Sequence, residues 1–449
     1  MLAKFKKKYI GDWDFYQKYL LLAIPMILQN AITNLVSFLD NIMVGQLGTE
    51  QMSGVAIVNQ LIFVYNLAIF GAVSAASIFG AQYFGKGNHK GHMYSFRFKL
   101  YATLLVTGGA ILLFLTKGSA LISLYLTDTV GNGATDLALQ YGLEYLAIMM
   151  VGLIPFAVNQ SYATNIKETG QTFIPMLASF VAVGTNAILD YLMIFGIGPF
   201  PELGVQGAAL ATVIARYIEA LIVVIWAHIH RGKNRYLEGA YTGFGIPLAE
   251  LKAILIKGFP LMMNEVLWAA GMTTVTQCYS VRGLDVVAGL NIASTITNLF
   301  NIVYLQLGSC ISIVVGQYLG AGKLEDAKDA DNKMIVFSVF CCVIMAALMF
   351  VVGGFFPGIY NTTEEIRELA TSFIAVSAII MPFCAFSHAS YFTLRSGGKT
   401  VVTFLFDSVF TWVIVVPAAY LLAHFTGLGI VGIYFLVQGT DCLLYTSPS

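Results

Sequence analysis

Charged residues are scarce in this sequence. Lys, Arg, Asp and Glu together make up 11% of its 449 residues, and the formal net charge is zero. Soluble globular proteins carry about 25% charged residues, and proteins that bind nucleic acid usually carry a basic surplus. The low charge therefore argues against a soluble globular protein, and the zero balance argues against a nucleic-acid partner.

The motifs of metal centres, catalytic triads and nucleotide sites are also missing. The six cysteines have no C-x-x-C spacing, and the six histidines form no H-E-x-x-H helix. Gly320-Ala-Gly322-Lys323 resembles a phosphate loop only superficially, because Leu324 follows the lysine where Ser or Thr is required. We therefore expect no enzymatic activity and no cofactor, and we do not expect ATP to supply the energy.

Long apolar runs, by contrast, are abundant. Hydrophobic residues make up 58% of the chain, and the mean hydropathy is +0.77. The runs have the length of a membrane-spanning helix, about twenty residues, rather than the roughly ten alternating residues of a barrel strand. The sequence predicts an all-α integral membrane protein with twelve transmembrane helices. Their expected ranges are 19–44, 54–80, 98–117, 137–163, 173–195, 206–228, 255–280, 286–316, 334–356, 367–393, 400–423 and a twelfth that begins near 428.

An internal repeat divides the chain into two related halves. Gln82-Tyr-Phe-Gly85 recurs 235 residues later as Gln317-Tyr-Leu-Gly320, and Pro25 recurs as Pro260. Further along, Ser161-Tyr-Ala-Thr164 has its counterpart in Ser390-Tyr-Phe-Thr393. Duplicated halves in an apolar chain are typical of transporters built from two lobes. We expect two pseudo-symmetric six-helix lobes, residues 1–235 and 236–441.

The distribution of Lys and Arg predicts the orientation in the membrane. The N-terminal segment and every second loop after it hold 20 of the 24 basic residues, among them Lys8, Lys90, Arg231 and Lys328. Loops rich in Lys and Arg stay on the cytoplasmic side. We therefore expect a cytoplasmic N-terminus and an even number of spans.

The last eight residues, 442–449, are similar to the translation of an adapter used in sequencing libraries. We expect this tail to be non-native. The twelfth helix would then be truncated, with roughly fourteen residues where about twenty are needed to span the bilayer.

A few polar residues remain inside the predicted spans of the first half. Asp40, Asn186, Asp190 and Thr212 all fall at a similar depth in the outer half of the membrane, given a rise of about 1.5 Å per residue. An ionisable group at this depth is costly unless it is paired or lines a cavity. Two carboxylates, an amide and a hydroxyl at one level predict a site for a proton or a hard cation such as Na⁺.

The second half has a different polar pattern. The repeat places Val275 opposite Asp40 and Ala418 near the position opposite Asp190, so the second half is apolar at these two points. Conversely, Glu265 takes the place of Asn30. Glu265 is a candidate contact for a cationic substrate or a proton, and the alternative is a buried acid held by hydrogen bonds. Other candidates for a substrate cavity are Gln29, Asn30, Asn264 and Met26, for which interhelical hydrogen bonding or core packing is the alternative.

The chain resembles the multidrug and toxic compound extrusion (MATE) family, in particular its NorM-like bacterial branch, over essentially its whole length. The matching elements are Leu39-Asp40-Asn-Ile-Met-Val-Gly45, Gln82-Tyr-Phe-Gly85, Asn186-Ala-Ile-Leu-Asp190-Tyr, Gly204-Val-Gln-Gly207 and Gly316-Gln-Tyr-Leu-Gly320. The resemblance implies alternating access and export of amphipathic, often cationic compounds driven by inward Na⁺ or H⁺ flow. It also implies a cation or proton site at Asp40, Asn186, Asp190 and Thr212, and a further acid at Glu265.

Two other functions stay open at this point. A flippase for lipid-linked oligosaccharides would need several intramembrane cations for a pyrophosphate, and only Arg216 qualifies. A cation channel would favour rings of carboxylates from symmetric subunits. For the transporter we expect small organic, often cationic substrates, contact with membrane lipid, a monomeric state and a location in the plasma (inner) membrane of a bacterium.

Overall fold

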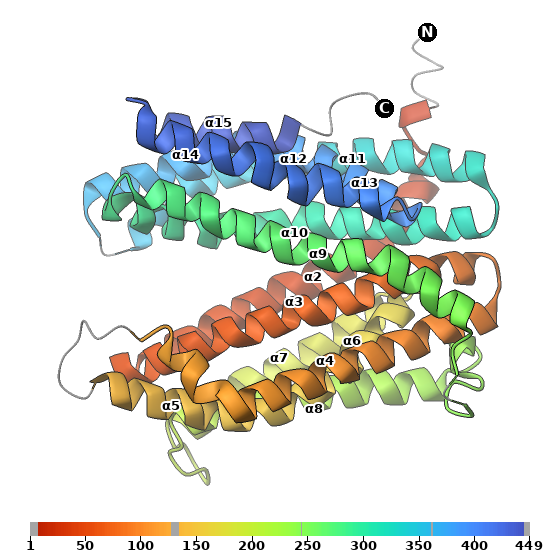
Figure 1. Cartoon of the computed structure of the whole chain (residues 1–449), viewed down its shortest axis with the longest axis horizontal. Helices are drawn as coiled ribbons and strands as arrows, with labels where there is room; N and C mark the ends of the chain where they lie inside the picture. The colour runs from red at the N-terminus through yellow and green to blue at the C-terminus, as the bar shows by residue number, and fades with distance from the viewer. Residues whose placement is uncertain (1–7, 127–133, 244, 361, 444–449) are drawn as a thin grey trace. The chain divides into compact units, whose positions relative to one another are not determined.

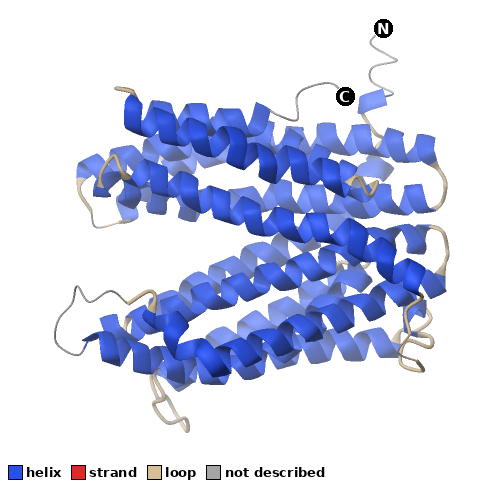
Figure 2. Ribbon diagram, in the orientation of Figure 1, coloured by secondary structure: helices blue, strands red, loops and turns tan. Residues whose placement is uncertain are grey.

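The chain is almost entirely helical in the part that the structure describes. The computed structural model describes residues 8–126, 134–243, 245–360 and 362–443, and Figure 2 shows helices joined by short loops in these ranges. The helices, labelled in Figure 1, are α2 (Trp13–Gly45), α3 (Thr49–Gly85), α4 (His89–Ser123), α5 (Ala134–Met149), α6 (Leu153–Glu168), α7 (Phe173–Ile194), α8 (Val205–Ile229), α9 (Leu248–Ser280), α10 (Leu284–Gly320), α11 (Leu324–Gly353), α12 (Glu364–Ser396), α13 (Thr400–Phe404), α14 (Val416–Phe425) and α15 (Ile430–Leu443).

The prediction of an all-α membrane protein is confirmed. Eleven helical stretches among the described residues are long and apolar enough to cross a membrane. One of them runs from Thr135 to Glu168 through α5 and α6, and another runs from Thr400 to Phe425 through α13 and α14. The apolar part of α15 among the described residues, Ile430–Thr440, is shorter, and the expected truncation of the twelfth helix stays a prediction. Residues 444–449 of the expected non-native tail lie outside the described residues.

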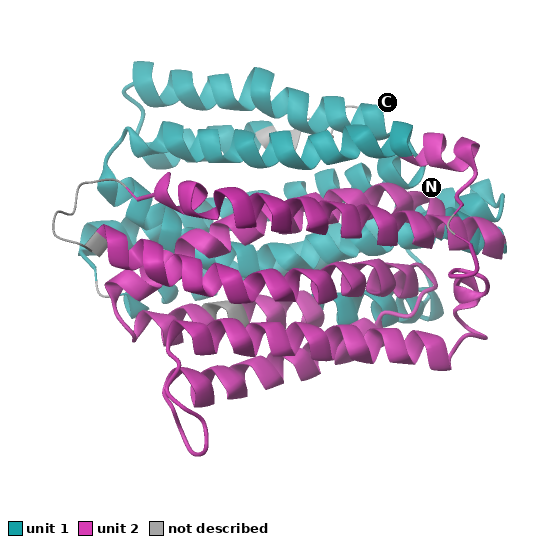
Figure 3. Ribbon diagram, turned by 60° about the horizontal axis from the view of Figure 1, so that its bottom comes forward, with its two compact units in different colours: residues 1–27, 81–87, 255–449 teal, residues 28–80, 88–254 magenta. Residues whose placement is uncertain are grey.

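The chain forms two compact units, which Figure 3 colours separately. Unit 1 comprises residues 1–27, 81–87 and 255–449, and unit 2 comprises residues 28–80 and 88–254. Each of α2 and α3 thus contributes to both units. The lobe boundary that the repeat suggests, between residues 235 and 236, stays a prediction.

Unit 2 is a helical bundle around an apolar core. In it α7 packs along α8, α4 packs along α6, and α5 packs on α8. The core includes Val58, Ile69, Leu146, Leu153 and Ile194, all of which are buried. These side chains come from α3, α5, α6 and α7, so one apolar cluster joins helices that are distant in sequence.

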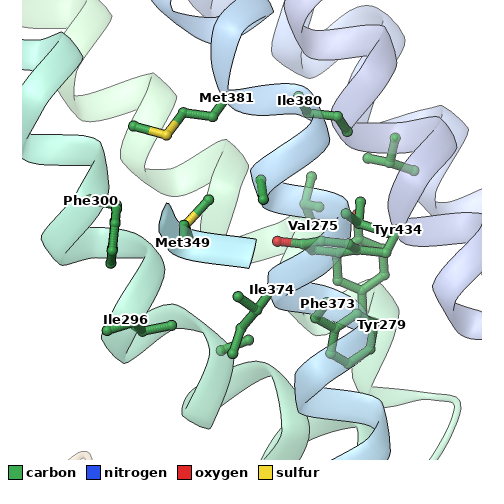
Figure 4. Packing of buried hydrophobic residues seen from close by; sticks show 14 of the residues in the cluster. Val275, Tyr279, Ile296, Phe300, Met349, Phe373, Ile374, Ile380, Met381 and Tyr434 are labelled. Atoms are coloured by element: carbon green, nitrogen blue, oxygen red, sulfur yellow. The ribbon is translucent and has the colours of Figure 1, made fainter. Parts of the chain in front are cut away.

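Unit 1 has a core rich in aromatic side chains, and its helices α10, α11, α12 and α15 pack on one another. Figure 4 shows Tyr279, Phe300, Phe373 and Tyr434 gathered with Met349. The rings of Phe373 and Tyr434 have centroids 4.9 Å apart. Aromatic pairs at this separation add to the stabilisation from burial alone.

Large apolar side chains also cover the outside of the bundles. On α4, Leu105 and Leu115 are 78% and 67% exposed, and on α11 Phe340 and Phe350 are similarly exposed. A soluble monomer rarely exposes so much apolar surface. A surface of this kind suits contact with lipid tails.

The repeated Gln-Tyr-x-Gly motifs meet inside unit 1, at the ends of α3 and α10. A Cβ atom on Gly85 would overlap the carbonyl oxygen of Gln317, and a Cβ atom on Gly320 would overlap that of Gln82. Only glycine permits this reciprocal approach of two backbones. A packing requirement that both halves share therefore explains the repeated motif.

Candidate functional site

Helix α7 carries the centre of the candidate site in unit 2. Its buried residues recur every three or four positions and include Ala178, Ala182, Asn186, Asp190 and Ile194. This spacing forms one face of an α-helix, so Asn186 and Asp190 point into the bundle with the apolar residues. Asp190 is 1% exposed, which makes it one of the most deeply buried acids of the chain.

The carboxyl groups of Asp40, on α2, and Asp190 meet inside unit 2. They lie within hydrogen-bonding range of each other. Oδ1 of Asp40 and both carboxyl oxygens of Asp190 are shielded from solvent, and no N–H or O–H group in the described part of the chain donates a geometrically sound hydrogen bond to them. A buried carboxylate without a donor is costly. The arrangement therefore favours a proton or a small cation shared by the two groups.

Asn186 and Thr212 lie beside this pair. Nδ2 of Asn186 donates to Oγ1 of Thr212 at 3.4 Å, and that hydroxyl donates to the carbonyl oxygen of Ala208 at 3.0 Å. Carboxylate, amide and hydroxyl oxygens are ligands of hard cations, so this set suits Na⁺ as well as H⁺. The structure brings together the four residues that the sequence singled out. What they bind stays a prediction.

A metal centre of the usual protein type is not present in the described ranges. No group of three or more His, Cys, Asp or Glu residues there could hold a metal ion. A Na⁺ ion between Asp40 and Asp190 would therefore need further oxygens, from Asn186, from Thr212 or from water. Such a weakly held ion suits a transported cation better than a resident one.

Tyr145 of α5 also belongs to this cluster, although its own sequence context does not distinguish it. Its hydroxyl donates to Oδ1 of Asn59 at 3.3 Å, and the group is close enough to Asp40 and Asp190 to interact electrostatically with both. A tyrosine in an apolar run is indistinguishable from a core residue by sequence. The one available signal was Asn59, an amide in the middle of a span.

Arg216 of α8 supplies the positive charge next to the cluster. It lies close to Tyr145 and Tyr65, and its guanidinium carbon is 5.2 Å from the centre of the Phe156 ring. Nη1 donates to the carbonyl oxygen of Gly152 at 3.5 Å. The aromatic face and the nearby carboxylate of Glu219 both stabilise this cation, which leaves the carboxyl pair available to another cation.

Unit 1 contains a separate polar cluster around Glu265 and Asn264 of α9. Oε1 of Glu265 lies 3.8 Å from Nη1 of Arg395. Nδ2 of Asn264 donates to Oδ2 of Asp407 at 2.7 Å, and the hydroxyl of Ser408 donates to the side-chain oxygen of Asn264 at 2.8 Å. The structure thus places both candidates of the second half, Glu265 and Asn264, in one network.

Asp407 is the residue of this network that the sequence reasoning missed. Asp407 is not the repeat counterpart of Asp40, Asp190 or Asn30, so the repeat does not point to it. It lies in a π-helical turn, Leu405–Val409, of the eleventh span. Such turns are rare and often occur at functional sites, but sequence periodicity does not reveal them.

The remaining candidates have structural partners. Nε2 of Gln29 donates to the hydroxyl of Ser179 at 2.7 Å, and that hydroxyl in turn donates to Glu219. Asn30 is half-buried, and Met26 is buried in an apolar cluster of unit 1. Hydrogen bonding accounts for Gln29 and packing accounts for Met26. Contact of Gln29, Asn30 and Met26 with a substrate stays a prediction.

Comparison with known proteins shows what the chain is similar to. The sequence profile of the family described as MatE matches residues 25–192 and 260–421, one segment in each half. A protein described as probable multidrug resistance protein NorM, from Thermotoga maritima, is 24% identical over 413 residues, which cover 92% of this chain and 86% of that protein. A protein with the same description from Halalkalibacterium halodurans is 24% identical over 424 residues, which cover 94% of this chain and 90% of that protein.

Solved structures give the same fold. A transporter of the MOP superfamily from Pyrococcus furiosus superposes with a TM-score of 0.85 and 20% identity, covering 97% of this chain and 94% of its own. The outward-facing structure of a multidrug resistance MATE family transporter superposes equally well, with a TM-score of 0.85 and 20% identity. At this identity the likeness concerns the fold.

Proposed function

Because this chain belongs to the MATE family, we propose that it is a cation-coupled antiporter that exports amphipathic, often cationic compounds by alternating access. Its similarity to NorM-like multidrug efflux proteins supports the proposal. The protein is a multi-pass membrane protein. We further propose that it acts as a monomer in the plasma membrane of a bacterium, with a cytoplasmic N-terminus, and that it needs neither a cofactor nor nucleic acid.

The observation that carries the proposal is the buried pair of Asp40 and Asp190. Oδ1 of Asp40 and both carboxyl oxygens of Asp190 have no geometrically sound hydrogen-bond donor among the described residues, and Asn186 is the neighbouring amide on the Asp190 side. Two neighbouring carboxylates in a low-dielectric site cannot both stay charged and unpaired without a large cost. The pair therefore takes up one proton or one Na⁺ ion. Asn186 and Thr212 orient the site from α7 and α8.

Binding of a cation to Asp40 and Asp190 would drive transport if it changes the relative populations of the transporter's conformations. A cation can shift that balance only if it binds one conformation more tightly than the other. A cation that enters from outside neutralises the pair, and its release to the cytoplasm restores two negative charges. In this scheme Glu265 in unit 1 contacts the positively charged substrate, with Arg395 as its partner when no substrate is bound.

Everted membrane vesicles test the proposal directly. Ethidium or norfloxacin transport is measured under a Na⁺ gradient and a pH gradient imposed separately. We expect transport with at least one gradient and none when both are collapsed. Transport that needs ATP, or that persists without any gradient, would contradict the proposal.

A further inference from the structure

A line of buried polar side chains runs along the interface between α4 and α6 in unit 2. Helix α4 contributes Thr107, Thr103 and Lys99, which follow one another at intervals of four residues, about one helical turn. Helix α6 contributes Ser161 and Asn165 with the same spacing. All five are buried. We call these five residues the α4–α6 seam. None of them belongs to the candidate cation site.

Hydrogen bonds join the seam across the two helices. The hydroxyls of Thr103 and Ser161 are 3.0 Å apart, and Nζ of Lys99 donates to Oδ1 of Asn165 at 2.6 Å. At the other end, the hydroxyls of Thr107 and Tyr65 are 2.8 Å apart. Tyr65 lies close to Arg216, so the seam begins next to the candidate site.

The opposite end of the seam reaches a buried charged group near the start of α4. Lys99 also donates to Glu168, the last residue of α6. Nε2 of His92 lies 3.4 Å from Oε2 of Glu168, and Tyr236 packs against the His92 ring at 4.9 Å between centroids. Because the loop before α4 is basic, we expect this end to face the cytoplasm.

From Thr107 to Lys99 the seam covers about 12 Å of helix α4, at about 1.5 Å per residue. The buried charged group extends this polar row to His92, about 22 Å from Thr107. The hydrocarbon core of a bilayer is about 30 Å thick, so the seam and the charged group together cover most of the distance between the candidate site and the cytoplasmic end of unit 2. Hydrogen bonds between helices also hold membrane bundles together, and the seam consists of separate hydrogen-bonded pairs in one row along the interface.

Each hydroxyl of these pairs has two possible acceptors, the partner hydroxyl and a backbone carbonyl oxygen. Holding the two helices together does not require this property. The hydroxyl of Thr103 can donate to Ser161 or to the carbonyl oxygen of Leu100 at 3.1 Å. The hydroxyl of Ser161 can donate to Thr103 or to the carbonyl oxygen of Ala157 at 3.1 Å. Each pair can thus reverse its hydrogen-bond direction without moving any heavy atom.

The pair at the outer end has the same property. The hydroxyl of Tyr65 can donate to Thr107 or to the carbonyl oxygen of Leu153 at 2.9 Å. That of Thr107 can donate to Tyr65 or to the carbonyl oxygen of Thr103 at 2.7 Å. Reversal of this kind is what a chain of hydroxyls needs after each passage of a proton.

We propose that the α4–α6 seam is a proton relay that connects the candidate site with the cytoplasmic side of unit 2, so that the coupling ion of this transporter is H⁺. The inference rests on the proposed function. At each hydroxyl a new O–H bond forms with the arriving proton as the existing O–H bond breaks and its proton moves on. At Lys99 an N–H bond breaks as a proton passes to Glu168, and a new N–H bond forms with a proton that water carries from the Thr103–Ser161 pair. One proton enters beside Tyr65, one leaves beside Glu168, and no group is oxidised or reduced.

The geometry of the seam favours a proton over Na⁺. Two hydroxyl oxygens in direct hydrogen bond, 2.8 and 3.0 Å apart, leave no site for a metal ion between them. Successive hydroxyl pairs are one turn, about 6 Å, apart, a gap that one water molecule can bridge.

The test uses the full-length protein in liposomes that contain a pH-sensitive dye, with ethidium as the transported probe. The double variant Thr103→Val and Ser161→Ala removes both hydroxyls and changes the shape little. We expect its ethidium-coupled proton flux to fall about tenfold or more, while ethidium binding in detergent changes by less than about twofold. The matched control is Thr116→Val, because Thr116 is an exposed residue of α4 that bonds only within its own helix.

Two further variants separate the relay from a packing effect. Thr103→Ser loses a methyl group but keeps the hydroxyl, and it should retain proton flux near that of the unmodified protein. Tyr65→Phe removes only a hydroxyl and should slow the flux even if the double variant folds poorly. A double variant with normal flux would overturn the relay. Ethidium transport driven by Na⁺ alone would also overturn it but leave the proposed function intact, whereas no transport under any gradient would remove the proposed function itself.

Discussion

Replacement of Asp190 by asparagine should uncouple the transporter from its ion gradient. The substitution keeps the size of the side chain and removes one of the two charges that meet inside unit 2. The amide can donate a hydrogen bond to Asp40, which satisfies that carboxylate without any added cation. Asp40→Asn should act in the same way from the other side of the pair.

The expected magnitude follows from the electrostatics of the pair. Two charges about 4 Å apart repel by roughly 4 kcal/mol at an effective dielectric constant of about 20. This repulsion is the free energy that a bound cation relieves, and it corresponds to a factor of about a thousand in cation affinity. Coupling free energies between two sites are usually about 1–3 kcal/mol. Gradient-driven efflux should therefore fall by about 5- to 150-fold.

Everted vesicles with ethidium provide the assay, and binding of ethidium to the purified protein provides the control for folding. We expect Asp190→Asn to insert into the membrane and to bind ethidium with nearly unchanged affinity. Asp285→Asn, which removes an exposed charge in the first turn of α10, is the matched control and should keep normal efflux. Near-normal efflux in Asp190→Asn, with an unchanged dependence on the gradient, would refute the coupling role of Asp190.

Three further substitutions test other parts of the structure. Glu265→Gln should change which cations are exported and leave cation binding in unit 2 intact, and an unchanged resistance profile across several cations would assign Glu265 to structure. Lys99→Met should destabilise the protein by about 3–5 kcal/mol because it leaves Glu168 buried without its partner, and the double variant Lys99→Met with Glu168→Gln should recover part of the melting temperature. Gly320→Ala should cost about 1–3 kcal/mol, because its methyl group overlaps the backbone at Gln82; a melting temperature equal to that of the unmodified protein would show that the contact adapts freely.

The helical architecture follows from the sequence because lipid imposes a simple rule. A backbone in hydrocarbon must satisfy its own hydrogen bonds, so every apolar run of about twenty residues becomes a helix. The expected span 173–195 corresponds to α7, Phe173–Ile194, and the expected span 206–228 corresponds to α8, Val205–Ile229. The π-helical turns around Asp407 do not follow from this rule. They depend on how that helix packs against α9, which no local pattern describes.

The meeting of Asp40 with Asp190 could be anticipated for a related reason. The membrane gives each helix a common reference plane, so the position of a residue along its span translates into depth. Depth alone does not say which way a side chain points. The structure shows the direction of Asp190, which lies on the buried face of α7.

The two halves of the chain have kept their backbone requirements and changed their polar side chains. Gly85 and Gly320 must both be glycine because each faces the other motif's backbone, and a substitution in either half would disturb the same crossing. Asp40 and its counterpart Val275 do not constrain each other in this way. Val275 packs in the apolar core of unit 1. Glu265 and Asp407 accordingly stand at positions that the first half does not use for acids. A duplicated fold can therefore hold a cation in one unit and contact a charged substrate in the other, since the repeat constrains the helix crossings and leaves the lining of each unit free to diverge.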